Sequence, residues 1–369
     1  MNPRPPHILI AGGGTGGHVY PAIAIADAIR DVHPDAVVVF AGTRDRLEAR
    51  AVPQAGYALH PITVSGFQRA WTWDNLSFPV KLIRGLVQSW RLTGAIDPDV
   101  VVGTGGYVAG PVGMAAWLRG IPLVMQEQNA YVGVTNRLLS PLAASRHVAF
   151  PEAQSALPDE GTHLSGNPIR PALLQADAEA ARTRHALSAT DTVLLVTGGS
   201  LGSAALNEAL RTHYQALLEA YPDVHIWWQT GTRYYEALDR TLTAHPRLRL
   251  MEYIDRMDEA YAVADLALCR AGALTCSELL ATATPAVLVP SPNVVEDHQT
   301  KNARSLSEVG AAVLLPEDEL TTDLRDTLHP LLNDAARRAA MATAAHDHAR
   351  PDAARTIARD VLRLATARS

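Results

Sequence analysis

Residues 8–21 (ILIAGGGTGGHVYP) place a short apolar run directly before a loop of six residues, five of which are glycine. A strand that enters a glycine loop and then a helix brings backbone N–H groups and the positive end of a helix dipole to one place. Such a place holds a phosphate or a negatively charged transition state. His18 follows the loop directly and is a candidate proton acceptor. The pattern predicts an α/β unit whose ligand site lies where the first strand ends.

The first glycine loop also matches a dinucleotide fingerprint, since Gly12, Gly14 and Gly17 satisfy G-x-G-x-x-G. An NAD site also needs an acidic residue about 20 residues further on, at the end of the second strand. The predicted second strand (36–40) continues instead into Ala41-Gly42-Thr43, without a carboxylate. The chain contains no G-x-x-x-x-G-K-[ST] loop either, so an NAD-dependent enzyme and a P-loop NTPase are both disfavoured.

Apolar strand patterns alternate with helical patterns along the chain, which predicts parallel sheets covered by helices on both faces. A second glycine loop (197–202) follows the apolar run 193–197, so a second Rossmann-like domain begins there. Ligands of such folds bind in clefts at the carboxyl ends of the strands. Strands are predicted at 7–11, 36–40, 100–102, 122–125, 193–197, 225–229, 248–251, 266–268 and 286–289.

The junction between the two domains is predicted in the Pro- and Gly-rich stretch SGNPIRP (165–171). This places an N-terminal domain at 1–165 and a C-terminal domain at 166–350. The Ala- and Arg-rich tail from Asp334 is predicted to form two helices. The second of these (352–367) can pack back on the N-terminal domain.

Composition excludes several classes of protein. The formal net charge of -6 disfavours bulk nucleic-acid binding. Cys269 and Cys276 fit no metal motif and are predicted to be small buried side chains. Residues 100–118 are uncharged but contain five glycines and a proline, so we expect a strand, a glycine turn and a helix there rather than a membrane span. No signal peptide is expected.

Seven motifs occur in order along the chain. They are GGGTGGHVYPA (12–22), GTGGYVAGP (103–111), QEQNAYVGVTNRLL (126–139), GNPIR (166–170), TGGSLGS (197–203), YIDRMDEAYAVADLALCRAGALTCSELLA (253–281) and EDHQTKNA (296–303). In this set, over residues 7 to 330, the chain resembles the MurG family of bacterial cell-wall glycosyltransferases, and the order of the motifs is more specific than any one of them.

The resemblance implies a GT-B fold, with two Rossmann-like domains whose parallel sheets face each other across a cleft. It implies transfer of N-acetylglucosamine (GlcNAc) from UDP-GlcNAc to the C4 hydroxyl of undecaprenyl-pyrophosphoryl-MurNAc-pentapeptide (lipid I), with inversion. The product is lipid II, a precursor for peptidoglycan synthesis. The implied location is peripheral, on the cytoplasmic face of the cell membrane, with cell-wall elongation or division proteins as further partners. No Asp-x-Asp pair is placed to bridge the diphosphate through a metal, so we expect no obligatory divalent cation or other cofactor.

Two residues are candidates for the base that takes the acceptor hydroxyl proton. His18 lies at the start of the first predicted helix, where the dipole disfavours an imidazolium cation. Glu127 lies just after the predicted strand 122–125 and is the rival, or else a partner of Asn129 or His18. The sequence leaves this choice open.

The family likeness assigns the donor site residue by residue. Arg170 would pair with the phosphates or the uracil side, or else form a structural ion pair. Glu278 would accept the ribose hydroxyls, Ile254 would contact uracil through its backbone, and Gln299 would hold the GlcNAc hydroxyls. The full set for UDP-GlcNAc is Thr15, Gly16, Gly17, Asn129, Arg170, Ser200, Ile254, Ala273, Leu274, Thr275, Glu278 and Gln299, with Tyr107 on the acceptor side.

The chain departs from the family pattern in two loops. Leu201 replaces the usual Gln of G-G-S-Q-G, which removes a polar contact there. Residues 65–69 read SGFQR where the family has a glycine- and arginine-containing loop, which weakens an acceptor role for that loop.

Residues 67–92 are predicted to contact an anionic membrane surface. The segment holds three of the six tryptophans and has a net charge of +3, from four basic residues and one aspartate. Apolar and aromatic side chains with basic neighbours suit such a surface, although part of the helix must also cover the first sheet. The residues assigned to this contact are Trp71, Trp73, Lys81, Arg84 and Trp90.

Several alternatives remain at this stage. Another UDP-sugar transferase acting on a lipid, such as diacylglycerol, would share the fold. A UDP-GlcNAc epimerase would share it too, but needs catalytic carboxylates. A membrane-surface binding module without catalysis is the third alternative.

Overall fold

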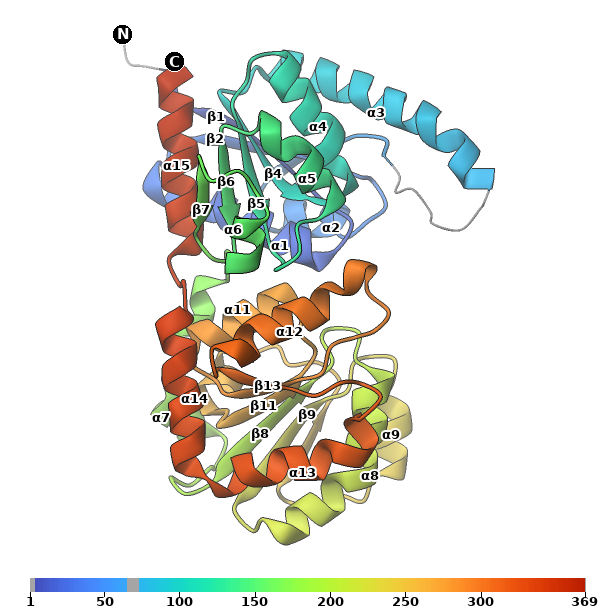
Figure 1. Cartoon of the computed structure of the whole chain (residues 1–369), viewed down its shortest axis with the longest axis vertical. Coiled ribbons are helices and arrows are strands. Elements are labelled where there is room, and N and C mark those ends of the chain that lie inside the picture. The colour runs from blue at the N-terminus through green and yellow to red at the C-terminus, as the bar shows by residue number, and fades with distance from the viewer. Residues whose placement is uncertain (1–3, 65–72, 369) are drawn as a thin grey trace. The chain divides into compact units, whose positions relative to one another are not determined.

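The computed structural model describes residues 4–64 and 73–368, apart from the side chains of 73–80, 82 and 295. The chain forms two compact units (Figure 1). The first comprises Met1–Ile169 and Pro351–Ser369, and the second comprises Arg170–Arg350. The chain passes from one unit to the other between Ile169 and Arg170, inside the predicted junction but after residue 165.

The described part of the first unit contains a seven-stranded parallel sheet in the order β3-β2-β1-β4-β5-β6-β7. Its strands are β1 (His7–Gly12), β2 (Val37–Gly42), β3 (Ala58–Pro61), β4 (Val100–Gly105), β5 (Leu123–Glu127), β6 (Ser145–Val148) and β7 (Thr162–Leu164). Its helices are α1 (Gly16–Val32), α2 (Glu48–Gln54), α3 (Trp73–Ile96), α4 (Gly106–Leu118), α5 (Val134–Leu139), α6 (Pro151–Ser155) and α15 (Ala353–Arg368), with a 3₁₀ turn at Ser140–Leu142.

Both faces of the first sheet are buried, which explains why β1 is apolar without interruption. Ile8 and Ile10 pack into a cluster with side chains of α1, α2 and α15. Leu9 and Ala11 face the other way, into a cluster with side chains of α3, α4 and α5. The alternation of side chains along β1 therefore supplies two cores from one short run of sequence.

The C-terminal helix α15 packs on the first unit. Ile357 and Val361 are fully buried in the cluster that contains Ile8 and Ile10. Asp360 adds a polar contact, since its Oδ2 lies 3.1 Å from Nε2 of His147, a buried residue of β6. The helix thus belongs to the first unit through both apolar packing and a partly buried polar pair.

The described part of the second unit contains a six-stranded parallel sheet in the order β10-β9-β8-β11-β12-β13. Its strands are β8 (Thr192–Thr197), β9 (Val224–Gln229), β10 (Leu248–Met251), β11 (Leu266–Cys269), β12 (Ala286–Leu288) and β13 (Ala312–Leu314). Its helices are α7 (Ala178–Arg184), α8 (Ala204–Ala220), α9 (Tyr235–Thr241), α10 (Met257–Val263), α11 (Ala273–Ala281), α12 (His298–Glu308), α13 (Leu320–Asn333) and α14 (Ala335–His348), with 3₁₀ turns at Pro171–Leu174 and Val295–Asp297.

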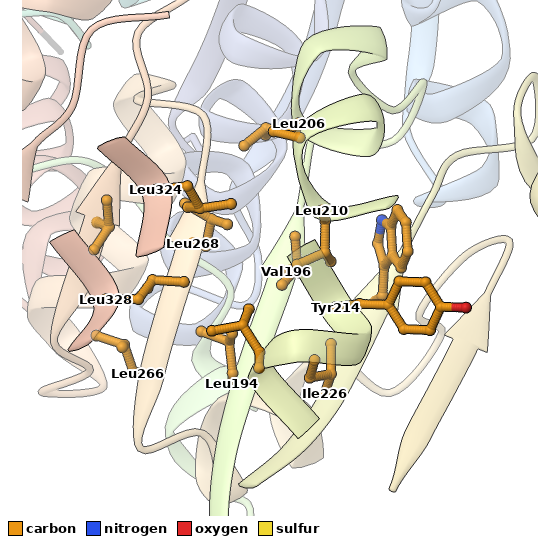
Figure 2. Close-up of a cluster of buried hydrophobic side chains, with 14 of the residues drawn as sticks. Leu194, Val196, Leu206, Leu210, Tyr214, Ile226, Leu266, Leu268, Leu324 and Leu328 are labelled. Carbon is orange, nitrogen blue, oxygen red and sulfur yellow. The ribbon is translucent and has the colours of Figure 1, made fainter. Parts of the chain in front are cut away.

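A leucine-rich core joins the second sheet to two of its helices (Figure 2). Leu194 and Val196 of β8 meet Leu210 of α8 on one side and Leu328 of α13 on another. Apolar residues recur along α8 and α13 at helical spacing, so each helix presents one stripe to the sheet. This packing holds the start of α8, and the glycine loop before it, at the end of β8.

The fold-class prediction of two α/β units with parallel sheets is confirmed. All nine predicted strands occur, with ends shifted by up to three residues. Four strands were not predicted: β3 and β7 are short and lie at sheet edges, β13 has three residues, and β6 contains Ser, Arg and His. Two of these shifts bear on the candidate site, because β4 extends through Gly105 and Glu127 is the last residue of β5 rather than following it.

The uncharged segment 100–118 forms β4 and α4, as the sequence predicts. Within residues 4–64 and 73–368, no helix is both long and apolar enough to cross a membrane.

The pair formed by Asp360 and His147 predicts a pH-dependent contribution to stability. Burial by itself would raise the pKa of Asp360, but hydrogen bonds with His147 and Ser145 outweigh it and hold that pKa below its usual range. Because the folded-state pKa lies below the unfolded value of about 4, the stabilisation is complete above that pH and is lost as the pH falls toward the folded-state pKa. Asp360→Asn should lower the free energy of unfolding by about 1–3 kcal/mol at pH 7.

Urea unfolding followed by circular dichroism at pH 7, 4, 3 and 2 measures this difference across the range in which the stabilisation should be lost. Asp35→Asn, at an exposed carboxylate of the same unit, is the control and should cost far less. A loss for Asp360→Asn that stays constant down to the acid end would contradict the assignment.

Candidate active site

The first glycine loop lies between β1 and α1 and is in close contact with its surroundings. A Cβ on Gly12 would overlap Thr104 Oγ1, and a Cβ on Gly13 would lie 2.5 Å from Glu48 Oε1. Thr104 Oγ1 in turn donates to the backbone oxygen of His18 at 2.9 Å. Glycine is therefore required here because side chains of β4 and α2 approach the loop backbone.

His18 lies in the first turn of α1, and its ring orientation is set by two oxygen atoms. Its Nδ1 is 2.9 Å from the backbone oxygen of Thr104 and 2.8 Å from Oε1 of Gln128. A carbonyl oxygen can only accept, so Nδ1 carries the proton and the neutral ring keeps its lone pair on Nε2. The ring is half-buried. The geometry leaves an imidazole nitrogen that can accept a proton from a bound hydroxyl group.

The turn between β4 and α4 packs against the same imidazole ring. A Cβ on Gly105 would lie 2.9 Å from Nδ1 of His18. Gly106 has φ +76°, which favours glycine, and a Cβ there would overlap the backbone oxygen of Gly13 and lie 3.4 Å from Cδ2 of His18. The ring thus sits between two glycine-containing turns.

A buried amide network continues from His18 into the sheet. Gln128 Nε2 donates to the Thr104 oxygen at 2.7 Å and also contacts the side-chain oxygen of Gln126. Gln126 Nε2 donates to Asn167 Oδ1 at 2.9 Å, and Asn167 Nδ2 donates to the Gln128 oxygen at 2.9 Å. These partners orient the Gln128 amide so that its oxygen faces His18.

Glu127 is buried and its carboxylate is surrounded by donors. Oε1 accepts from the backbone N–H of Asn129 at 3.0 Å. Oε2 accepts from the backbone N–H of Gly133 and from Nδ2 of Asn136, both at 2.9 Å. A carboxylate with this many donors holds the loop from β5 to α5 in place. Sequence reasoning proposed Glu127 as a possible base but did not identify Asn136 or Gly133 as its partners.

The other first-unit predictions fall on more exposed positions. Thr15 and Gly17 are exposed, Gly16 and Asn129 are half-buried, and Tyr107 in the first turn of α4 is 55% exposed. Along α3, Lys81 is half-buried, and Arg84 and Trp90 are exposed. Trp71 and the side chain of Trp73 lie outside the described residues.

The second unit contains a cavity of about 570 Å³ at the carboxyl ends of its strands. Five predicted donor-site residues line it, from the second glycine loop, α11, α12 and the start of the unit. They are Arg170, Ser200, Thr275, Glu278 and Gln299. The cavity therefore brings together residues that are far apart in the sequence.

The second glycine loop forms one wall of this cavity. Gly202 has φ +77° and approaches the backbone of Thr230 so closely that a Cβ would overlap its oxygen. Ser203 follows as the N-cap of α8, with its Oγ accepting from the N–H of Leu206 at 3.4 Å. Ser200 is exposed at the loop. The loop thus directs the start of α8 toward the cavity.

Glu278 is one of two glutamates that line the cavity, together with Glu317. Tyr261 donates its hydroxyl to Oε2 of Glu278 at 3.0 Å. Burial raises the pKa of Glu278, and the positive charge of Arg170 and the Tyr261 hydrogen bond oppose that rise. The Glu278 carboxylate is thus placed in the cavity wall as an acceptor for hydroxyl groups.

Cys269 and Cys276 are buried, as the sequence predicts, and burial raises the pKa of the Cys269 thiol to about 12.

Gln299 is oriented by a backbone contact. Its Oε1 accepts from the N–H of Ser291 at 2.9 Å, which turns the Nε2 donors away from that partner. Two non-glycine residues before it, Glu296 and Asp297, have φ of +58° and +50°. Such backbone strain is found at ligand sites, where the surrounding structure holds it.

Three of the predicted donor residues in the second unit are not among those that line the cavity: Ile254, Ala273 and Leu274. The backbone N–H of Ile254 donates to Gln229 Oε1 at 2.9 Å. Ala273 and Leu274 form the first turn of α11, next to Thr275. Because this N–H group is already bonded, a backbone contact of Ile254 with uracil would have to use its carbonyl oxygen.

Sequence reasoning missed several cavity residues, above all Arg270. Its guanidinium donates to Ser203 Oγ at 2.7 Å and pairs with Glu317. Arg270 directly follows β11, so its place at the carboxyl end of a buried strand was a usable signal. Glu317 lies three residues after β13, a strand that the sequence did not predict, so its position gave no such signal. Tyr234, Tyr253 and Met257 also line the cavity.

Two α/β units with parallel sheets, each with a glycine loop after its first strand, are typical of the GT-B fold of glycosyltransferases. Comparisons with known proteins agree with this class. Residues 8–148 match the glycosyltransferase family 28 N-terminal domain, and residues 193–357 match the glycosyltransferase family 28 C-terminal domain.

The relatives narrow this class to one family. A Salinibacter ruber protein is 64% identical over 365 residues, covering 99% of this chain and 98% of the relative. A Flavobacterium psychrophilum protein is 38% identical, covering 96% and 97%. Both are named UDP-N-acetylglucosamine–N-acetylmuramyl-(pentapeptide) pyrophosphoryl-undecaprenol N-acetylglucosamine transferase. The crystal structure of Acinetobacter baumannii MurG matches with TM-score 0.79 and 31% identity, over 97% of this chain and 100% of that chain. The chain belongs to this family of glycosyltransferases.

Proposed function

We infer that the chain transfers GlcNAc from UDP-GlcNAc to the MurNAc C4 hydroxyl of lipid I and so makes lipid II. The observation that carries this inference is the 64% identity, over nearly the full length of both chains, to a transferase named for these substrates. The chemistry of the two glycine-loop sites is consistent with it. The reaction belongs to peptidoglycan synthesis.

The cavity of the second unit is proposed to bind UDP-GlcNAc. Arg170 and the donors of the second glycine loop would stabilise negative charge on the departing diphosphate, where each preorganised donor is typically worth ~3 kcal/mol. Glu278 would accept the ribose hydroxyls, and the amide N–H groups of Gln299 would donate to the sugar hydroxyls. This donor set needs no obligatory divalent cation.

His18 is proposed as the base of the transfer. The acceptor oxygen would form a bond to C1 of GlcNAc while the bond from C1 to UDP breaks, which inverts C1. The hydroxyl proton would move to Nε2 of His18, the nitrogen left unprotonated by the contact of Nδ1 with Thr104. Glu127 is proposed to hold the β5–α5 loop rather than to take the proton, because donors already occupy both of its oxygens.

The proposed activity predicts acceptor-dependent release of UDP. The purified chain with UDP-GlcNAc and a short-chain lipid I analogue should release UDP, and should do so far more slowly with UDP-glucose or without an acceptor. The rate should be unchanged by EDTA. Release with diacylglycerol but not with lipid I would instead favour the other candidate, a UDP-sugar transferase acting on a different lipid.

If His18 is the base, substitution of His18 and substitution of Glu127 should have different effects on kcat and on its pH dependence. His18→Ala should lower kcat by about 10²–10⁴-fold and remove the acid limb of the kcat/KM profile, while the affinity for UDP stays unchanged. Glu127→Gln should lower kcat through the altered loop but keep the acid limb. If the limb disappears in Glu127→Gln and persists in His18→Ala, the assignment is reversed.

The exposed face of α3 is proposed to dock on an anionic membrane, which would place the enzyme peripherally on the cytoplasmic leaflet. Ile83, Val87 and Trp90 are exposed at helical spacing, by 63%, 43% and 40%, and we name them the α3 patch. Arg84 and Arg91 lie beside them, and the guanidinium of Arg119 stacks on the Trp90 ring at 3.9 Å. Apolar side chains with adjacent cations favour an anionic lipid surface.

The double variant Ile83→Glu/Val87→Glu should weaken binding to vesicles containing phosphatidylglycerol at least tenfold, because it replaces apolar contacts with repelled charges. Cosedimentation measures the bound fraction. Val309→Glu, at an exposed apolar position of the second unit, should bind like the unaltered chain. Equal losses for both variants would contradict docking through the α3 patch.

A further inference from the structure

Glu48 is a buried carboxylate beneath the first glycine loop, and the function above gives it no role. It is the first residue of α2 and its relative exposure is 0%. Its Oε2 accepts from the backbone N–H of Gly14 at 3.0 Å. Its Oε1 accepts from the N–H of Thr43 at 3.0 Å and from the Thr43 hydroxyl at 2.7 Å. One side chain therefore joins the end of β2 to the loop after β1.

The carboxylate is suited to hold the loop in its charged form. Burial by itself would raise the pKa of Glu48, but the hydrogen bonds from Gly14 and Thr43 outweigh burial and lower that pKa. A buried carboxylate that lost one of these three hydrogen bonds would destabilise the fold, so the side chain needs all three donors. An ionised oxygen also makes a stronger bond to a backbone N–H than a neutral one does.

Contacts continue from Glu48 to the imidazole ring of His18. Gly13 lies between Glu48 and the β4–α4 turn, since a Cβ on Gly13 would lie 2.5 Å from Glu48 Oε1 and a Cβ on Gly106 would overlap the Gly13 oxygen. Gly106 and Gly105 in turn lie against the His18 ring. With no side chain to absorb a displacement, a shift of the loop at Glu48 is passed on to the turn that packs on the ring.

We propose that Glu48 is a positioning residue for the transfer, which holds the first glycine loop and thereby His18 in the reacting geometry. This rests on the proposed function. The sequence predicts that the N–H groups of the first glycine loop bind an anion. The N–H group of Gly14 is already bonded to the carboxylate of Glu48, so the loop does not offer that group to a phosphate. Glu48 acts through the loop backbone and does not touch the substrate.

The test is the isosteric variant Glu48→Gln. An amide has one acceptor oxygen, so it cannot accept from both backbone N–H groups, and the bond to Gly14 or to Thr43 is lost. We expect kcat for lipid II synthesis to fall by 10–100-fold, since a displacement near 1 Å costs about this much. The Kd for UDP alone should change by less than twofold, because Glu48 belongs to the first unit and the cavity is lined by residues of the second.

The matched control is Tyr57→Phe. Tyr57 is also buried in the first unit, and its hydroxyl donates to Asp27 at 2.7 Å, so the variant loses a charge-assisted hydrogen bond away from the glycine loop. Its melting temperature should fall, but its kcat should stay within twofold of the unaltered chain. If Glu48→Gln loses melting temperature and keeps kcat in the same way, the residue is only structural and the proposal is overturned.

Hydrogen exchange of the unaltered chain gives a readout that needs neither catalysis nor a variant. The Gly14 amide should be protected at least tenfold more than the Gly17 amide, which lies in the first turn of α1. Equal exchange rates of the Gly14 and Gly17 amides would contradict the role of Glu48 in holding the loop, even if Glu48→Gln fails to fold. Absence of turnover in the unaltered chain would instead contradict the proposed function, and the exchange result would still decide whether Glu48 holds the loop.

Discussion

The candidate active site of the first unit depends on the close approach of two backbones, the loop after β1 and the turn after β4. At this approach a Cβ on Gly12 or Gly106 would overlap neighbouring atoms. The same approach brings the Thr104 oxygen to His18 Nδ1, which selects the tautomer with a free Nε2. Neighbouring parallel strands end at the same edge of a sheet, so a loop after β1 and a turn after β4 necessarily meet. The tautomer of His18 thus follows from the pairing of β1 with β4 in the sheet.

The two units use a similar glycine loop in opposite ways. In the first unit, the carboxylate of Glu48 occupies a loop N–H group and the loop supports a histidine. In the second unit, the loop opens on a cavity with Arg170 and Arg270 in its wall. An internal anion disfavours a bound phosphate, whereas guanidinium groups favour one. Similar local sequences therefore acquire different ligand preferences from the side chains that other elements bring beside them.

Much of the fold was predictable because buried parallel strands are continuous apolar runs, and glycine loops mark where they end. β6 was missed because its run includes Ser, Arg and His, whose polar atoms are satisfied by partners distant in sequence, such as Asp360 for His147. Glu48 was missed for a related reason, because its role depends on hydrogen bonds to backbone atoms that no local pattern specifies. The position of Arg270 after β11 was a usable signal, but its contact with Ser203 was not predictable from local sequence.

By itself, the sequence determined the two α/β units and the two glycine loops, because these features are encoded in local spacing. The grouping of Arg170, Ser200, Thr275, Glu278 and Gln299 as donor-site candidates came from the resemblance of the ordered motifs to one family. The tertiary structure alone decided which nitrogen of His18 is free, that donors surround the Glu127 carboxylate, and that Glu48 lies beneath the first loop. Hydrogen bonds between distant residues set protonation and orientation, and the distances that govern them exist only once the strands are paired.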